Sequence, residues 1–110
     1  MGADWWWRTL MYYNIAFSND TIVSDLRRLI NQIWKLIPMR EHEEDWQKQL
    51  DHVLLELRGL NIMFGDQLSL LRLLSELEGL HEVNNFMVYR SAVFTCISLL
   101  TELTNSIDVN

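Results

Sequence analysis

The densest cluster of groups that could perform chemistry is the charged run at residues 40–45, which contains Glu41 and Glu44. A metal ion needs ligands that converge, which on one helix means a spacing of three or four residues, and Glu41 and Glu44 have that spacing. Acids are also favoured at a helix N-terminus by the helix dipole alone. We therefore interpret the run as the solvated start of a helix, in which Glu44 and Lys48 form a surface pair.

A second pair with ligand spacing, His52 and Glu56, follows on the same predicted helix. His42 and Glu43 begin the zinc-protease pattern His-Glu-x-x-His, but Trp46 stands where the second histidine is required. The zinc ion of such a site would lack one of its ligands. We predict no zinc-protease site here.

Two further metal-binding patterns are each matched only in part. Glu78 and His81 form one Glu-x-x-His, a unit that di-iron helical bundles use twice, and Gly79 interrupts the helix that would carry it. In length and helix content the chain also resembles the all-α nucleotide pyrophosphohydrolases, whose signature is Glu-x-x-Glu followed by Glu-x-x-Asp. Glu41 and Glu44 match the first half, and no downstream segment supplies the second. The resemblance therefore fails at the residues that would bind Mg²⁺.

Nucleophilic catalysis needs a cysteine or serine next to a base. Cys96 lies in an apolar stretch, and the histidines fall on other predicted helices, so we interpret it as a packed structural residue. The four glycines are dispersed and form no phosphate-binding loop. We predict no catalytic, cofactor-binding or metal-binding residues, and no enzymatic function.

Composition narrows the class of protein. A chain of 110 residues with 49% hydrophobic content, four glycines and one proline can bury one core, so we expect a single domain over 1–110. The net charge of −6 argues against direct nucleic-acid binding, which relies on clustered Lys and Arg. Residues 59–110 carry few charges, with Arg72 and Arg90 as their bases. We expect part of this half to be buried in the core or against a partner.

The cellular compartment is inferred from cysteine usage and from the start of the chain. A single cysteine cannot form an internal disulfide, which favours a cytoplasmic or nuclear location. Residues 1–8 do not contain the basic segment followed by an apolar segment that a secretory signal has. No uninterrupted apolar run approaches the roughly 18 residues of a spanning helix. We predict a soluble protein that does not bind membranes.

Apolar residues recur at steps of three and four, which predicts helices near 20–37, 40–58, 66–80 and 85–104. The first begins after the N-capping types at 18–20, and we expect Pro38 to stop it. The run 59–66 reads as an apolar connection with Gly65 as the breaker and Asp66 as the next cap. Asn84 or Asn85 is expected to cap the last helix, which frays over 104–106.

The segment 1–18 is rich in aromatic residues. Trp6, Leu10, Tyr13 and Phe17 fit one face of a short helix, while the aromatic content also suits a strand. We expect a helix and leave the strand open. The predicted fold class is therefore all-α, a four-helix bundle-like domain with an additional short N-terminal helix or extended segment. Paired amphipathic helices with short turns also describe a fragment of a helical-repeat protein.

Excess apolar residues suggest where a partner would bind. Three consecutive tryptophans point in different directions on a helix, so Trp5 and Trp7, with Tyr12, are candidates for exposure. Leu68 and Leu71 widen the apolar face of the third helix beyond an ordinary amphipathic stripe. These five residues are the predicted partner-binding residues. The other interpretation is that the aromatics fill a thin core.

The sequence favours a non-catalytic helical protein–protein interaction module without cofactors. Its partner would be another protein in a larger helical assembly or a second copy of the chain, as a homodimer. An alternative is a small acidic inhibitor or nucleic-acid mimic that blocks a basic groove on a target, for which the acids of 41–56 must form one exposed face. A metal-dependent hydrolase is the third hypothesis.

Overall fold

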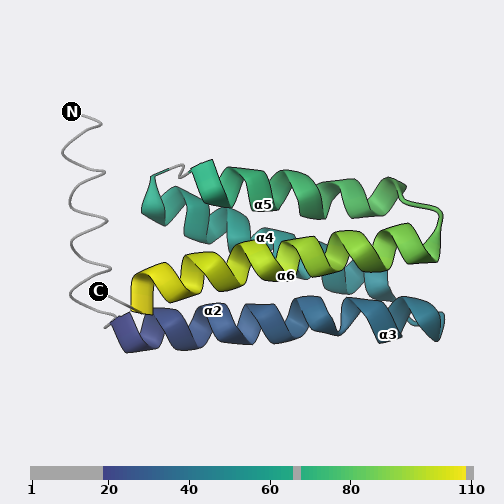
Figure 1. Ribbon diagram of the computed structural model, residues 1–110, viewed down its shortest axis with the longest axis horizontal. Helices are drawn as coiled ribbons and strands as arrows, with labels where there is room; N and C mark the ends of the chain where they lie inside the picture. The colour runs from purple at the N-terminus through teal and green to yellow at the C-terminus, as the bar shows by residue number, and fades with distance from the viewer. Residues whose placement is uncertain (1–18, 66–67, 109–110) are drawn as a thin grey trace.

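The computed structural model describes residues 19–65 and 68–108, which form an all-α globule of four long helices packed together, with no strand in these ranges (Figure 1). The elements in chain order are α2 (Asn19–Trp34), α3 (Leu36–Glu41), α4 (Trp46–Phe64), α5 (Leu68–Gly79), the short 3₁₀ helix η1 (Leu80–Glu82) and α6 (Phe86–Asp108). The predicted all-α, bundle-like fold is confirmed. The predicted N-terminal helix or extended segment at 1–18 lies outside the described residues.

The helices form a bundle in which each long helix contacts its neighbours along one apolar stripe. α6 packs against α2 on one side and α5 on the other, while α4 packs against α2 and α5. α4 and α6 therefore occupy opposite corners, and in Figure 1 α4 lies behind α6. As a result, α6 and α4 each present an outer face that no other described helix covers.

The core is built mainly from leucine and isoleucine at helical spacing. The fully or almost fully buried side chains of α2, α4, α5 and α6 are Leu26, Leu29, Ile33, Leu50, Val53, Leu57, Leu70, Leu73, Leu77, Tyr89, Val93, Cys96 and Leu100. Burying one such side chain contributes about 1.5–3 kcal/mol relative to leaving it in water. Each of the four helices predicted from apolar periodicity contributes to this set, although Trp34, predicted on the apolar side of the first helix, is 43% exposed.

The end of the first helix differs from the prediction. Pro38 does not stop the helix but lies in the first turn of α3. Lys35 keeps helical backbone angles (φ −63°, ψ −21°), and the Met39 N–H donates to the Lys35 carbonyl at 3.1 Å, so α3 continues the line of α2 after a one-residue interruption (Figure 1). The phenol of Tyr89 donates a hydrogen bond to the Leu36 carbonyl at 2.9 Å, so this junction also contacts α6.

The predicted limits of the second helix are wrong at both ends. The acids of 41–45 precede α4, and Asp45 is its N-cap, accepting a hydrogen bond from the Lys48 backbone N–H at 3.3 Å. At the other end α4 passes through Gly59 and continues to Phe64. Gly65 then ends it with a left-handed φ of 75°, as predicted for the breaker. Asp66, the predicted cap of the next helix, lies outside the described residues.

α6 is the longest helix, with 23 residues. The Asn85 side chain accepts hydrogen bonds from the backbone N–H groups of Met87 and Val88, at 2.9 and 3.1 Å, which confirms it as the cap. The helix does not fray at 104–106 but continues to Asp108. In length and composition α6 is apolar enough to cross a membrane, with a mean hydropathy of 1.3 for an 18-residue window within 86–107. The central helix of a water-soluble bundle has the same composition, and Val93 of α6 is fully buried in the core.

Candidate interaction surface

Two of the predicted partner-binding residues lie in the described part of the chain. Leu68 and Leu71, on the first turns of α5, are 81% and 42% exposed. Trp5, Trp7 and Tyr12 lie outside the described residues. The widened apolar face predicted for this helix is therefore present on the surface of the protein rather than in its core.

An ion pair and a hydrogen-bond contact join the outer edge of α4 to α5 and η1. Arg58 pairs with Glu78 at 2.7 Å, and the Asp51 carboxylate lies 2.9 Å from Nε2 of His81. Glu78 and His81, which share the Glu-x-x-His spacing of a metal ligand pair, thus have different partners on α4. Among the residues that the structure describes, no group of three or more His, Cys, Asp and Glu side chains is placed to hold a metal ion.

Exposed apolar side chains follow the same edge of α4 and α5. Leu55 and Ile62 flank Arg58 at helical spacing and are 67% and 62% exposed. Leu71 lies two turns before Glu78 on α5, so it falls on the same seam. We call Leu55, Ile62 and Leu71 the α4–α5 face. No role was predicted for Leu55 and Ile62, because an exposed apolar side chain on a helix is common. The packing of α5 on α4 brings Leu71 to the same side.

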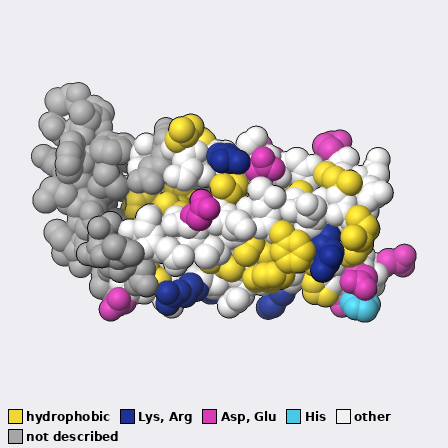
Figure 2. All heavy atoms as spheres, in the orientation of Figure 1, with side chains coloured by type: hydrophobic (Ala, Val, Ile, Leu, Met, Phe, Trp, Pro, Cys, Tyr) yellow, Lys and Arg dark blue, Asp and Glu magenta, His cyan; other side chains and the backbone are white. Residues whose placement is uncertain are grey.

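A second uncovered surface runs along α6 (Figure 2). Its exposed residues on the described chain are Met87, Val88, Arg90, Ser91, Thr95, Ser98, Glu102, Asn105 and Ser106. Met87 and Val88 are 64% and 56% exposed. At the seam with α2, Trp34 is 43% exposed and lies edge-on to Phe94, with 5.2 Å between ring centroids. We call the exposed residues of α6 the α6 face.

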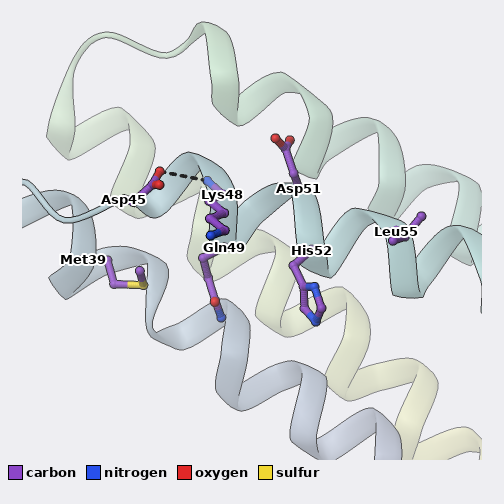
Figure 3. Close-up of a pocket in the computed structure, with 7 residues that line it drawn as sticks. All are labelled: Met39, Asp45, Lys48, Gln49, Asp51, His52 and Leu55. Atoms are coloured by element: carbon purple, nitrogen blue, oxygen red, sulfur yellow. Dashed lines mark hydrogen bonds between the residues drawn. The ribbon is translucent and has the colours of Figure 1, made fainter.

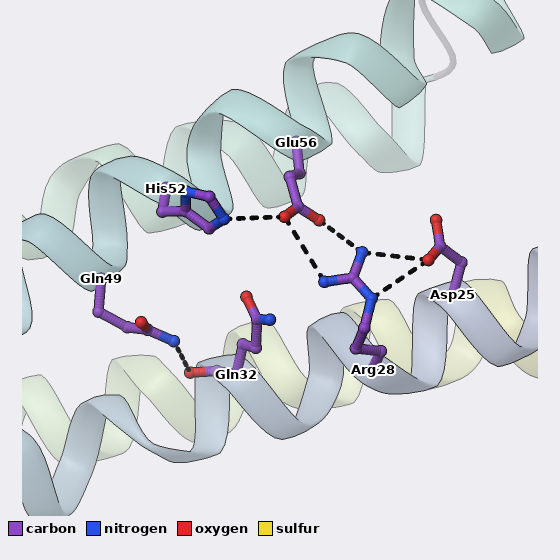
Figure 4. Close-up of polar contacts among 6 residues, drawn as sticks. All are labelled: Asp25, Arg28, Gln32, Gln49, His52 and Glu56. Atoms are coloured by element: carbon purple, nitrogen blue, oxygen red, sulfur yellow. Dashed lines mark hydrogen bonds and ion pairs between the residues drawn. The ribbon is translucent and has the colours of Figure 1, made fainter.

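His52 and Glu56 of α4, which have the spacing of metal ligands, take part in a network of polar contacts between α4 and α2 (Figure 4). His52 Nε2 lies 3.1 Å from the Glu56 carboxylate, whose other oxygen accepts from Arg28 of α2 at 2.7 Å. Arg28 also pairs with Asp25 at 3.1 Å. Hydrogen bonding to Glu56, and then to Asp25, raises the pKa of the Arg28 guanidinium. This network links α2 to α4, and neither a serine nor a cysteine takes part in it.

An open depression of about 530 Å³ lies beside this network (Figure 3). It is lined by Met39, Asp45, Lys48, Gln49, Asp51, His52 and Leu55. Asp45 already caps α4 through the Lys48 N–H, and His52 is engaged with Glu56. Since all but Met39 come from α4 or its cap and point in different directions, the depression lacks the convergent polar groups of a ligand site.

Arg40, within the charged run, has a structural role that the sequence did not reveal. Its guanidinium carbon lies 4.8 Å from the ring centroid of Trp46 and 4.4 Å from that of Tyr89, and Nη2 donates to the Asn84 carbonyl at 3.1 Å. Cation–π contacts of this kind stabilise by about 0.5–2 kcal/mol. Arg40 therefore joins the end of α3 to α4 and α6.

Two buried groups have strongly raised pKa values. Burial raises the pKa of the Tyr89 phenol to about 12, although the Arg40 charge opposes the shift. Burial also raises the pKa of the Cys96 thiol to about 12, and the negative charge of Glu76 contributes. The thiol is therefore protonated at neutral pH, so Cys96 is not an activated nucleophile.

The fold and the surface together define a compact α-helical bundle with two uncovered faces. No protein-family model, no curated protein and no solved structure matches this chain.

Proposed function

We propose that this protein is a helical protein–protein interaction module, and that its two uncovered faces are the surfaces through which it associates. The observation that carries the proposal is the group of large apolar side chains left exposed on the described helices. Its members are Trp34, Leu55, Ile62, Leu68, Leu71, Met87 and Val88. Large apolar side chains that gather on the surface of a folded protein often mark a site that a partner covers.

A partner that covers these side chains would gain the free energy of removing them from water. Leu68 is 81% exposed and Leu55 67% exposed, so most of the roughly 1.5–3 kcal/mol of burying each side chain remains available to a partner. The ion pair between Arg58 and Glu78 adds a polar element within the α4–α5 face. An apolar patch around a satisfied polar pair is a common composition for a protein interface.

Site-specific photo-crosslinking in the source cells tests the proposal. A photoreactive side chain at Leu55, Leu68 or Met87 should give a covalent adduct with protein, either a second copy or another chain. The same group at Ser24, an exposed polar residue of α2, is the matched control and should give little adduct. If the three apolar positions react no more than Ser24, the proposed function is wrong.

A second candidate is an acidic inhibitor of a basic target. Glu41, Glu43, Glu44 and Asp45 are all exposed around the α3–α4 connection, which favours it. Further along α4 the acidic surface is not continuous, because the carboxylate of Asp51 already contacts His81. A crosslinker at Glu44 separates this candidate from the first, because only the acidic-inhibitor hypothesis predicts adducts there that disappear at high salt.

A further inference from the structure

α2 and α6 meet at an exposed aromatic pair on one side of the bundle. Trp34 is 43% exposed and lies edge-on to the half-buried Phe94, with 5.2 Å between ring centroids. The guanidinium carbon of Arg90 lies over the Phe94 ring, 5.1 Å from its centroid. Met87 and Arg90 precede Phe94 by seven and four residues, so all three lie on the side of α6 that borders α2. Figure 2 shows hydrophobic side chains gathered beside Lys or Arg side chains at this seam.

Arg27 extends this surface on the α2 side. It is exposed and precedes Trp34 by seven residues, or two helical turns, so both residues lie on the same side of α2. Because α2 and α6 run in opposite directions (Figure 1), Arg27 and Arg90 lie at opposite ends of the aromatic pair, about 16 Å apart along the bundle. We call Arg27, Trp34, Met87, Arg90 and Phe94 the Trp34 patch.

Acidic residues are absent from the chain segments that form this patch. In a protein of net charge −6, residues 26–40 and 83–101 contain five basic residues and no Asp or Glu. The five are Arg27, Arg28, Lys35, Arg40 and Arg90. Arg90 forms no ion pair with a carboxylate in the described part of the chain. The Trp34 patch is therefore a basic and apolar surface on an acidic protein.

The chemistry of the patch selects an acidic and apolar partner. Tryptophan, phenylalanine, methionine and arginine are residue types enriched at protein interfaces. A large apolar side chain of a partner would cover the aromatic pair, and a neighbouring carboxylate would accept hydrogen bonds from the Arg90 guanidinium. We propose that the Trp34 patch binds an amphipathic segment of another protein in which carboxylates flank large apolar side chains. This inference rests on the proposed function and names the chemistry of the partner for one of its surfaces.

Two other occupants fit the charge distribution less well. A nucleic-acid strand that extended beyond the patch would meet Glu41, Glu82 and Glu102, which border the acid-free segments and are all exposed. A second copy would bring together two chains of net charge −6, and its exposed acids at 41–45 have no large exposed apolar side chain near them in the sequence. A separate acidic segment has neither disadvantage.

A synthetic peptide tests the required charge. The probe has about 15 residues, enough to form a helix, with leucine and phenylalanine on one side and glutamate on the other. Its matched control has glutamine in place of every glutamate. Binding of each fluorescein-labelled peptide to the full chain is measured by fluorescence anisotropy. The glutamate peptide should bind at least about tenfold more tightly than the glutamine peptide, and about 1 M salt should remove most of this difference.

Variants of the chain locate the bound peptide. Arg90→Glu should weaken binding of the glutamate peptide at least about tenfold, and Trp34→Ala should weaken binding of both peptides. Arg72→Glu makes the same charge change at an exposed position on α5, which packs on the other side of α6 from α2, and should leave binding nearly unchanged. Circular dichroism confirms that each variant is folded, which is expected because all three side chains are exposed.

Four results would overturn the inference. The two peptides could bind equally or not at all at about 1 mM, or Arg90→Glu could weaken binding no more than Arg72→Glu does. A single-stranded oligonucleotide that binds the patch more tightly than the glutamate peptide would assign it to nucleic acid. A dimer in sedimentation velocity that Trp34→Ala dissociates would assign it to a second copy. In each case photo-crosslinks to protein at Leu55 or Leu68, which lie outside the patch, would still support the proposed function.

Discussion

The phenol of Tyr89 offers a quantitative test of how α6 is held against the junction of α2 and α3. The ring is fully buried on α6, and its hydroxyl donates to the Leu36 carbonyl at 2.9 Å. Tyr89→Phe keeps the ring and removes only the hydroxyl. At neutral pH we expect the substitution to lower the free energy of unfolding by about 0.5–1.5 kcal/mol, the usual net contribution of such a hydrogen bond.

The effect should change sign at high pH. The phenol has a pKa of about 12 in the folded protein and an ordinary value of 10.0, so the folded state favours the neutral form. The stability that the folded protein gains from keeping the phenol neutral is fully present below pH 10 and is lost as the pH rises through 12. The whole difference corresponds to about 2.7 kcal/mol, of which about half is lost by pH 11. The unaltered protein and Tyr89→Phe should therefore be about equally stable near pH 11, with the variant more stable above it.

Urea unfolding of both proteins, followed by circular dichroism between pH 7 and 12, measures this crossing. The variant serves as the control for every other group that titrates in the same range, including Cys96, because only the difference between the two proteins is interpreted. If the difference stays constant from pH 9 to 12, the phenol is not buried as described. If Tyr89→Phe costs nothing at pH 7, the hydrogen bond to Leu36 does not stabilise the folded protein.

Four further predictions concern single positions. Gly59→Ala should stabilise the protein by about 0.5–1 kcal/mol in urea unfolding, because a Cβ there meets no atom within 4 Å inside α4, and an unchanged or lower stability would contradict this. Glu43→Gly should also stabilise the protein, by about 1 kcal/mol, because Glu43 has a positive φ of 59°, which glycine adopts more easily. Gly65→Ala should destabilise it, because Gly65 has a φ of 75°. Equal effects of the two substitutions would refute the backbone argument. Asn85→Ala should cost about 1 kcal/mol by removing the α6 cap, measured as a fall in the unfolding midpoint that Asn85→Asp does not cause. Cys96 should react with a thiol reagent at pH 8 only after unfolding, and rapid labelling of the native protein would show that it is not buried.

The sequence predicted the four long helices because each carries a strong apolar stripe. The residues at which these helices begin and end were less predictable. Pro38 was expected to stop a helix, but it is tolerated in the first turn of α3, and the helical backbone angles continue through Lys35. Gly59 was expected to belong to a connection, although the packing of Leu60 and Phe64 against the core offsets the roughly 1 kcal/mol that a helical glycine costs.

The candidate surface was only partly predictable. Leu68 and Leu71 were identified because they exceed what one helical stripe can bury, and both are exposed. Leu55 and Ile62 lie on one side of α4 by helical spacing, but Leu71 joins them only through the packing of α5 on α4, which no local spacing predicts. The network of Arg28 with Glu56 was missed for the same reason, since its partners are 28 residues apart and meet only through packing of α2 on α4.

The contacts of Arg40 have a consequence for how the molecule opens. This one side chain touches Trp46 at the start of α4, Tyr89 in α6 and the carbonyl of Asn84 before α6. Segments that share the contacts of one side chain unfold together as a cooperative unit. In native-state hydrogen exchange the amides of 36–46 and 84–89 should therefore exchange as one cooperative unit, with a common free energy of opening. Arg40→Met, which removes the charge but keeps much of the side chain's length, should separate the two segments into independent opening events.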